Sequence, residues 1–351
     1  FALSLYPYVY LLARTALSDR ANHLMEAARL LGAPLSRRIL RIALPLARPA
    51  IAAGTALALM ETLADYGVSS YFGIQTFTAG IYKAWLVMDN QIAAAQLATF
   101  LLLAVLLLLA LEQRAQSRLR FASGRIDRDG QEAQPTILRG WAACVAFFLC
   151  VLPILLGFVL PVAFMLRALF QGGDWTSLPW ARFMQWAWAS LSLGMLTACL
   201  AGMVALLLSA QTRLMPTVLS RGIKGLVGLG YAVPGAVVVI GLLLPVGWLQ
   251  ARWPDSGLGY WITATVLGLV WAYLVRFVSV AMQSVQSGYA RIPVSMDDSA
   301  RMLGVAGWSL VLRVHWPLLR KPLTAASLLV LVDVMKELPA TLVLRPFNTD
   351  T

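Results

Sequence analysis

The stretch EAARLLGAPLSRRILRIALP, residues 26–45, decides how this chain folds, because a related stretch returns later in the sequence. The second stretch is DSARMLGVAGWSLVLRVHWP, residues 298–317, and it lies 272 positions further along. In both, six positions separate the acidic residue from a glycine and thirteen separate the glycine from a proline, at Gly32 and Pro45 and again at Gly304 and Pro317. The repeat predicts a chain built from two related halves.

The composition places these halves in a membrane. Of the 351 residues, 60% are apolar and 13% are charged, and the mean hydropathy is +0.74, which is too apolar for a soluble domain. Seven apolar runs are long enough as helices to cross a hydrocarbon layer about 30 Å thick; they cover residues 46–64, 92–111, 141–170, 187–210, 223–249, 260–282 and 323–344. Residues 1–13 are also apolar but would rise only about 20 Å as a helix, so we expect a chain truncated at both ends.

The expected fold class is all-α, a polytopic transmembrane helical bundle of two pseudo-equivalent halves. Residues 113–139 are rich in Gln, Ser, Gly, Asp and Arg and predict a cytosolic linker. The linker separates the closing part of a first half, residues 1–112, from a second half, residues 140–351, that lacks its final span. Because both motifs are expected on one side of the membrane, the axis relating the halves should run along the membrane normal.

The cations predict which side that is. The alternate intervals between spans that contain the two motifs and the linker are rich in arginine, whereas the remaining intervals hold only Lys83, Arg182, Arg252 and Arg345. By the positive-inside rule the arginine-rich loops face the cytosol. The formal net charge of +12 is then a consequence of topology, and it does not indicate nucleic-acid binding.

Each motif has the local signals of two short helices. In the first, Ser18 and Asp19 are candidate N-caps for a helix over 20–31 that Gly32 ends, and Ser36 is a candidate cap for a second helix. In the second, Ser295 and Asp298 form a sequence typical of a capping box, Gly304 ends the helix, and Pro317 precedes a span. Pro45 fits a bend where the chain enters the first of these spans.

The repeat extends into the spans that follow the motifs. Glu61 and Asp65 are matched, 272 positions later, by Asp333 and Glu337, so each half has two carboxylates four residues apart on one helix face. Carboxylates in spans are costly in lipid and should face protein or water. Two roles stay open for them: a place along a transport route, or a structural hydrogen bond near a helix end.

The two motifs resemble the EAA loop of ATP-binding-cassette importer permeases, which docks onto the ATPase subunit. The resemblance assigns that role to Glu26, Ala27, Ala28, Gly32 and Pro45 in the first copy, and to Asp298, Ala300, Gly304 and Pro317 in the second. It implies a permease of the type I kind that binds two copies of an ATPase subunit, a periplasmic substrate-binding protein and the lipid bilayer of a bacterial inner membrane. It also implies alternating access, with ATP and Mg²⁺ held by the ATPase subunits and no cofactor in this chain.

Within that family the stretches ETLADYG, residues 61–67, and YFGIQTFTAGIY, residues 71–82, look most like ferric-iron permeases. Similar fused permeases carry thiamine or polyamines, and these cargoes remain alternatives. The residues themselves do not supply an iron site, because the two histidines, His23 and His315, both fall in the cytosolic loops and are expected to be solvated or to face a partner. Asp65 or Tyr66 would be the oxygen ligands available to guide a ferric ion.

Other protein classes fit less well. The chain has no G-x-x-x-x-G-K-[ST] sequence, so ATP hydrolysis is expected on another polypeptide and the chain is not expected to be an enzyme. A membrane-embedded enzyme usually needs clustered His, Cys or carboxylate residues, and those of this chain are scattered. An ion-coupled secondary transporter is the remaining alternative, but it needs no docking loop and usually places its acids near the middle of the bilayer.

Overall fold

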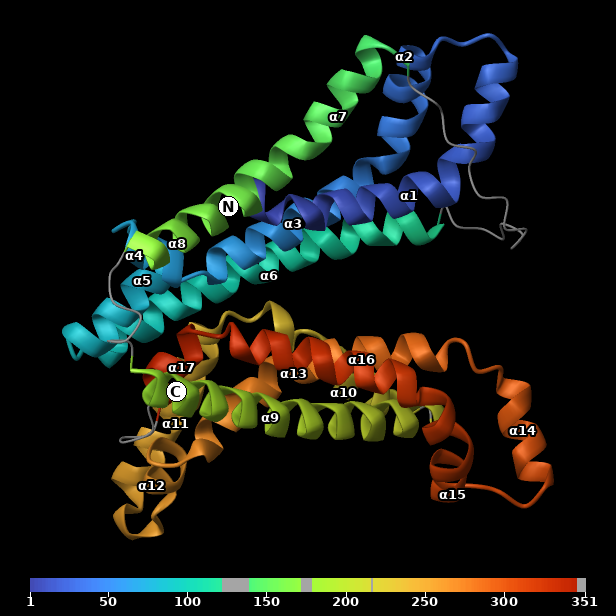
Figure 1. The fold of residues 1–351 in the computed structure, drawn as a ribbon. Coiled ribbons are helices and arrows are strands. Elements are labelled where there is room, and N and C mark those ends of the chain that lie inside the picture. The colour runs from blue at the N-terminus through green and yellow to red at the C-terminus, as the bar shows by residue number, and fades with distance from the viewer. Residues whose placement is uncertain (122–138, 172–178, 216, 346–351) are drawn as a thin grey trace. The chain divides into compact units, whose positions relative to one another are not determined.

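The computed structural model describes residues 1–121, 139–171, 179–215 and 217–345, with the side chains of residues 18–24, 26, 115–121, 221, 256 and 258 left aside. Within these ranges the elements are helical, and their order is shown in Figure 1. The α-helices are α1 (Ala2–Leu30), α2 (Leu35–Arg38), α3 (Leu44–Ala64), α4 (Gly67–Tyr71), α5 (Phe77–Tyr82), α6 (Gln91–Phe121), α7 (Trp141–Ile154), α8 (Leu160–Gln171), α9 (Trp180–Leu214), α10 (Val218–Gly228), α11 (Gly235–Arg252), α12 (Leu258–Thr263), α13 (Val266–Tyr289), α14 (Val294–Met302), α15 (Trp308–Leu310), α16 (Trp316–Met335) and α17 (Pro339–Leu344). The fold is therefore all-α, as the sequence predicts.

The helices pack into two compact units. Unit 1 comprises Phe1–Thr62 and Ala104–Leu178, and unit 2 comprises Leu63–Leu103 and Pro179–Thr351. These packing units divide the chain differently from the halves expected from the repeat, which stay a prediction. Most of the expected linker, 122–138, lies outside the described residues.

Close backbone approach at glycine holds part of unit 1 together. A Cβ atom on Gly54 of α3 would lie 2.6 Å from the Cα atom of Val9 in α1, and one on Gly157 would meet the backbone oxygen of Leu3. Only glycine permits such crossings, which is the usual means of packing helices in lipid, where there is no hydrophobic driving force between them.

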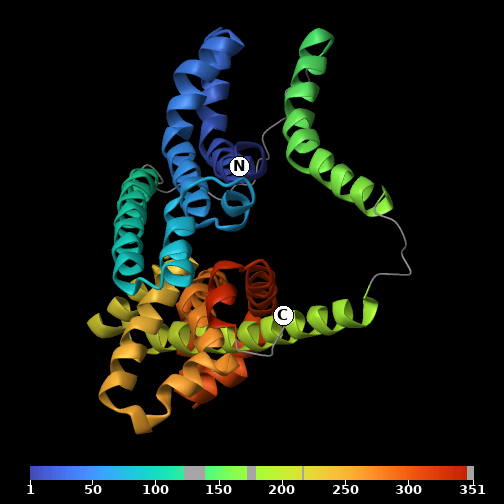
Figure 2. The same cartoon turned by 90° about the vertical axis from the view of Figure 1, so that its left-hand side faces the viewer.

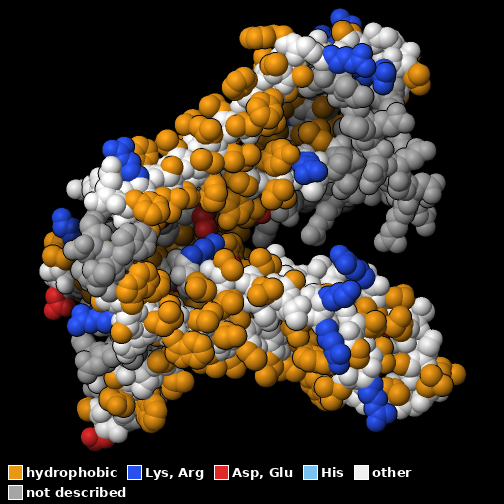
Figure 3. Space-filling view, viewed as in Figure 1, with side chains coloured by type: hydrophobic (Ala, Val, Ile, Leu, Met, Phe, Trp, Pro, Cys, Tyr) orange, Lys and Arg blue, Asp and Glu red, His pale blue; other side chains and the backbone are white. Residues whose placement is uncertain are grey.

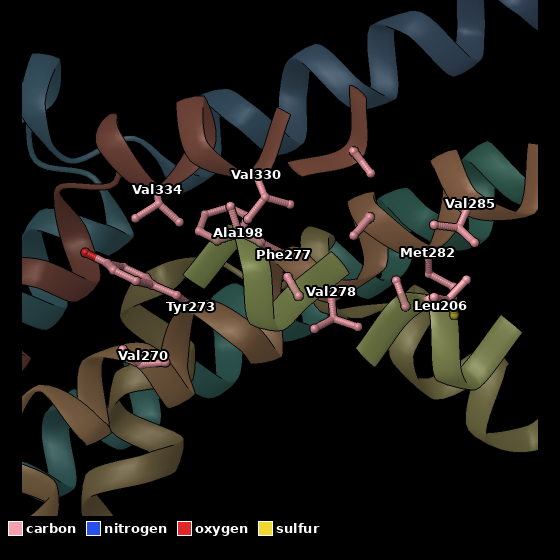
Figure 4. Packing of buried hydrophobic residues seen from close by; sticks show 14 of the residues in the cluster. Ala198, Leu206, Val270, Tyr273, Phe277, Val278, Met282, Val285, Val330 and Val334 are labelled. Atoms are coloured by element: carbon pink, nitrogen blue, oxygen red, sulfur yellow. The ribbon is translucent and has the colours of Figure 1, made fainter. Parts of the chain in front are cut away.

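The core of unit 2 lies between α9, α13 and α16. Figures 1 and 2 both show α9 running alongside the other two helices, and Figure 4 shows their side chains meeting. The fully buried members include Ala201, Ala205, Phe277, Val285, Leu319 and Val330. Small residues on α9 bring its backbone close to α16, whereas large exposed side chains such as Trp271 and Leu328 cover the outer surfaces. That distribution suits a lipid-exposed bundle.

Six helices in the described part of the chain are long and apolar enough to cross a membrane. They are Leu35–Ala64, Gln91–Arg114, Trp141–Gln171, Trp180–Leu214, Gly235–Arg252 and Val266–Tyr289. Six of the seven expected spans therefore have a counterpart, although several of their boundaries differ.

The predicted span 223–249 is broken where Pro234 follows Val233. α10 ends at Gly228 and α11 begins at Gly235, and Val233 is extended (ψ 119°), as expected for the residue before a proline. The predicted span 260–282 is also offset, because Thr265 caps a new helix, α13, by accepting a hydrogen bond from the Leu267 amide (3.2 Å).

The prediction that residues 323–344 form a single membrane-crossing helix was wrong. α16 ends at Met335, and α17 begins at Pro339. Pro339 has no N–H group to donate to the carbonyl of Met335, so the α-helical hydrogen-bond ladder cannot continue through it. This break places Glu337 between two helices, which matters for the functional site.

Candidate docking loops and helix breaks

The first loop begins at the end of a single long helix. α1 is continuous from Ala2 to Leu30, so the N-caps predicted at Ser18 and Asp19 were wrong: both residues lie inside the helix. Gly32 then adopts φ +75°, and the Ala33 amide donates to the Ala28 carbonyl (3.0 Å). This is the helix-ending geometry in which glycine is favoured. The next helix, α2, is preceded by Pro34 in the capping position, so Ser36 is not its cap.

The second loop repeats this geometry. α14 ends at Met302, Gly304 has φ +79°, and the Val305 amide donates to the Ala300 carbonyl (2.9 Å). These positions are each 272 residues beyond their counterparts in the first loop. The capping box predicted from Ser295 and Asp298 was wrong, because Pro293 occupies the capping position and Ser295 lies within α14.

A wide helical turn follows each loop at equivalent positions. Residues Ile39–Ala43 and Val311–His315 are both π-helical, and each segment ends two residues before the motif proline. A proline ring clashes with the carbonyl of the residue four positions earlier, and a π turn relieves this by widening the helix. Pro45 and Pro317 therefore lie within the helical runs that enter the spans and not at a sharp bend.

The tips of the two loops present the same surface. Leu31 is 87% exposed and Leu303 is 83% exposed, and each follows another exposed apolar residue, Leu30 or Met302. Exposed aliphatic pairs at a polar helix end are costly in water and are typical of surfaces that bind another protein. Figure 3 shows Lys and Arg side chains gathered near α2 and, separately, near α15 and the adjoining ends of α13 and α16.

The motif residues differ in exposure. Ala27 is exposed and Ala28 half-buried, whereas Ala300 is buried. The side chain of Glu26 lies outside the described residues. Asp298 is exposed and forms an ion pair with Arg301 (3.3 Å). The acidic position of the second motif thus lies at the surface, paired with a neighbour on the same helix.

His315 is not solvated, so the expectation for this residue was wrong. Its side chain is 0% exposed, its Nε2 atom lies 3.1 Å from Asp297, and its Nδ1 atom lies 3.2 Å from the Tyr289 hydroxyl. Burial by itself would raise the pKa of Asp297, but hydrogen bonds from Arg213 and His315 lower it below the ordinary aspartate value. His23, the other histidine, lies among the residues whose side chains are not described.

The second acid of each carboxylate pair caps a short helix at a helix break. The amides of Val68 and Ser69 donate to Asp65 (both 3.1 Å), and the amide of Ala340 donates to Glu337 (3.4 Å). Val68 and Ala340 are 272 positions apart, as are the two acids. The repeat therefore includes the cap, and this structural role accounts for a side-chain hydrogen-bond acceptor at both places.

Glu337 also forms a buried ion pair with Arg276 of α13. Sequence analysis did not single out Arg276, although a lone arginine inside an apolar run is a recognisable signal of an intramembrane partner. A Cβ atom on Gly235 would collide with the Glu337 carboxylate, so glycine at the start of α11 makes room for the pair. The other acids differ: Asp333 pairs with Lys336 (2.9 Å), and Glu61 is half-buried in α3.

The two equivalent breaks approach each other within unit 2. The Tyr82 hydroxyl donates to the Pro339 carbonyl (2.6 Å), and the rings of Tyr66 and Tyr82 lie 4.4 Å apart. A Cβ atom on Gly67 would lie 3.5 Å from Leu338. Beside the second break is a cavity of about 310 Å³ whose lining includes Ser190, Lys336, Glu337 and Thr341.

No group of three or more His, Cys, Asp or Glu residues able to hold a metal ion is present in the described part of the chain. Asp65 and Tyr66 are the residues expected to guide a ferric ion. In the structure the Asp65 carboxylate accepts hydrogen bonds from the start of α4, and the Tyr66 ring contacts the ring of Tyr82.

Comparison with known proteins shows which membrane proteins this chain is similar to. Residues 1–121 match the family described as "Binding-protein-dependent transport system inner membrane component". Over 356 residues the chain is 23% identical to the Fe(3+)-transport system permease protein FbpB 2 of Haemophilus influenzae, and the match covers 99% of this chain and 67% of that protein. No solved structure matches the chain. The chain is thus similar to the inner-membrane permease components of binding-protein-dependent transport systems, and its membrane-crossing helices fit a multi-pass membrane protein of that kind.

Proposed function

We propose that this permease moves ferric iron from a periplasmic binding protein to the cytosol, driven by two ATPase subunits that dock on the loops 26–45 and 298–317. ATP and Mg²⁺ belong to those subunits, and the permease changes between outward-open and inward-open states. The cargo is inferred from the name of the relative from Haemophilus influenzae and from the likeness of residues 61–82 to ferric-iron permeases.

The observation that carries the docking proposal is the matched pair of loop tips. Each tip has two exposed apolar residues immediately before a glycine with positive φ, and the tips lie 272 residues apart. Burying one exposed leucine in a partner contributes about 1.5–3 kcal/mol. Two equivalent tips suit two copies of one partner subunit, because related surfaces bind related partners.

The acids Glu61, Asp65, Asp333 and Glu337 are proposed to lie along the translocation route. Support comes from the two helix breaks, which meet at equivalent positions near the cavity beside Glu337. Residues related by a two-fold pseudo-repeat contact each other only close to its axis, and a shared route follows that axis. The four carboxylates would attract a cation. The helix breaks beside Asp65 and Glu337 would let the route become wider or narrower.

Reconstitution with separately purified partners tests the proposal. The permease, its ATPase and its capture protein in proteoliposomes should take up radiolabelled ferric iron in the presence of ATP, and excess thiamine or spermidine should not compete. Uptake of thiamine with no response to iron would remove the cargo assignment. Failure of the ATPase to co-purify with the permease would remove the docking assignment.

A further inference from the structure

We propose that Arg213, Asp297 and His315 act as positioning residues that clamp the second docking helix, α14, to α9 and α13, so that these helices move as one body. This inference rests on the proposed docking of the loops. It assigns the transmission of force in the second half to a specific set of buried polar contacts.

Arg213 joins three segments through one guanidinium group. It lies in the last turn of α9, and its Nε atom donates to Asp297 of α14 (2.7 Å). Its terminal nitrogens donate to the carbonyls of Tyr289 (3.0 Å) and Ile292 (2.9 Å). These carbonyls close the end of α13 and the turn before α14. The planar, multidentate guanidinium fixes the relative orientation of the groups it binds, which a single point charge does not.

His315 adds a fourth segment to the clamp. It is the last residue of the π turn after the second loop, and its two ring nitrogens contact Asp297 and the Tyr289 hydroxyl. A neutral imidazole with its proton on Nε2 satisfies both contacts. The beginning and the end of the loop are therefore connected to each other as well as to α9 and α13.

Burial makes the clamp costly to open. The side chain of His315 is inaccessible, that of Asp297 is 4% exposed, and that of Arg213 is 16% exposed. Separating α14 from α13 would leave a charge without its partner in a poorly solvated site. Motion imposed on α14 by a partner is therefore transmitted to the spans α9 and α13.

The first loop does not have these groups. The positions equivalent to Asp297, His315 and Tyr289 are Met25, Ala43 and Leu17. The shared backbone geometry therefore does not require the clamp, and stabilising the loop conformation is not its main role. Its presence in one copy gives the second half a stiffer connection between loop and spans.

Spin-label distances in the intact importer complex test this inference. Labels at Ser299, an exposed position on α14 outside the apolar tip, and at Ser287, on the exposed face of α13, report the distance between the two helices. In the wild-type complex the distance distribution should be narrow and the same with and without ATP. In Asp297→Asn it should broaden, and cargo uptake per ATP hydrolysed should fall on the order of tenfold.

Matched variants separate the clamp from general stability. Asp255→Asn makes the same chemical change at an exposed position outside the docking loops and should leave the distance distribution narrow. His315→Gln keeps a donor for Asp297 and should retain a narrow distribution, whereas His315→Leu should not. Arg213→Lys keeps the charge but loses the forked contacts, so it should broaden the distribution even if Asp297→Asn does not accumulate.

Two results would overturn the clamp: a wild-type distance that changes with ATP, or variants that keep both the narrow distribution and the uptake per ATP. If the docking proposal itself fails, the ATPase will be missing from the wild-type complex, and this outcome differs from a clamp failure in a complete complex.

Discussion

The two copies of the loop and helix break share a backbone but differ in how they are anchored. Both have a positive φ at the motif glycine, a π turn before the motif proline, and an acid that caps the helix after the break. In the second copy, buried ion pairs with Arg213 and Arg276 are added. The positions equivalent to Asp297 and Arg276 in the first copy are Met25 and Ser4.

This difference shows that backbone shape and anchoring are specified separately. Glycine and proline act through their own backbone, so the same spacing produces the same loop twice. The ion pairs depend on residues far away in the sequence, and these are free to differ between copies. We therefore expect changes at the shared positions to affect both copies alike, and changes at the ion pairs to affect the second copy alone.

The largest expected contrast is between Glu337→Gln and Asp65→Asn. The first change leaves Arg276 buried without its charged partner and should destabilise unit 2 by about 3–5 kcal/mol. Asparagine at position 65 still caps α4, so the second change should cost less than about 1 kcal/mol. Thermal unfolding in detergent measures the stability of each variant, and uptake assays measure its rate of cargo transport.

The double variant Glu337→Gln with Arg276→Gln is the control for this contrast, because it removes both charges and should recover part of the lost stability. Equal destabilisation by the two single variants would contradict the proposed difference between the copies. Wild-type transport rates in both would assign these acids to structure alone.

The next effect concerns the loop tips, where the two copies should behave alike. Leu31→Asp and Leu303→Asp each place a charge where an apolar contact is proposed, and each should weaken ATPase binding by about 1.5–3 kcal/mol. Binding of the purified ATPase to the permease in nanodiscs measures this. Leu31→Met and Leu303→Met preserve the apolar surface and should bind like wild type; binding that survives both aspartate variants would remove the tips from the interface.

Gly32→Val and Gly304→Val should have a smaller effect, again similar in both copies. No atom lies within 4 Å of a Cβ at either position, so the cost arises from the left-handed backbone and not from a collision. That cost is roughly 1–2 kcal/mol. In both loop variants membrane insertion should be normal, while ATPase co-purification and uptake fall. Gly241→Val is the control, because this glycine is helical and has equally open surroundings. It should change neither co-purification nor uptake. Normal uptake in both loop variants would count against the proposed loop geometry.

The smallest expected effect is a dependence of the second loop on pH. The pKa of Asp297 is lowered in the folded protein, so its contribution to stability is present at neutral pH and is lost as the pH falls through that lowered pKa. Hydrogen exchange of the amides around 297–303 should therefore speed up at acid pH relative to neutral pH, after correction for intrinsic rates. The amides around 25–31 should show no such change, because Met25 does not titrate; an equal change in both loops would contradict the assignment.

Much of the fold was predictable from residues that act locally. The repeat interval, Gly32, Gly304 and the apolar runs correctly predicted an all-α membrane protein with two equivalent loops. The starts of the loop helices were not predicted, because α1 continues through Ser18 and Asp19, whose capping potential is overridden by the helix that precedes them. The break at 336–338 was missed because apolar composition continues across Pro339.

The site was predictable in part, for a related physical reason. Spacing identified Asp65 and Glu337 as equivalents, and the structure places both at helix breaks. The partners Arg213 and Arg276 lie 84 and 61 residues from the acids they bind, and no local pattern connects such pairs. His315 was misjudged because its sequence position lies in a polar loop, while its neighbours in space enclose it completely.

The most direct test of the account uses single cysteines at positions 31 and 303, in a background with Cys144, Cys150 and Cys199 replaced. A membrane-impermeant maleimide should label both cysteines only from the cytosolic side of oriented vesicles, and bound ATPase should protect both from labelling. Labelling from the periplasmic side, or labelling at full rate while the bound ATPase still drives uptake, would contradict the claim that the paired loops are the docking sites.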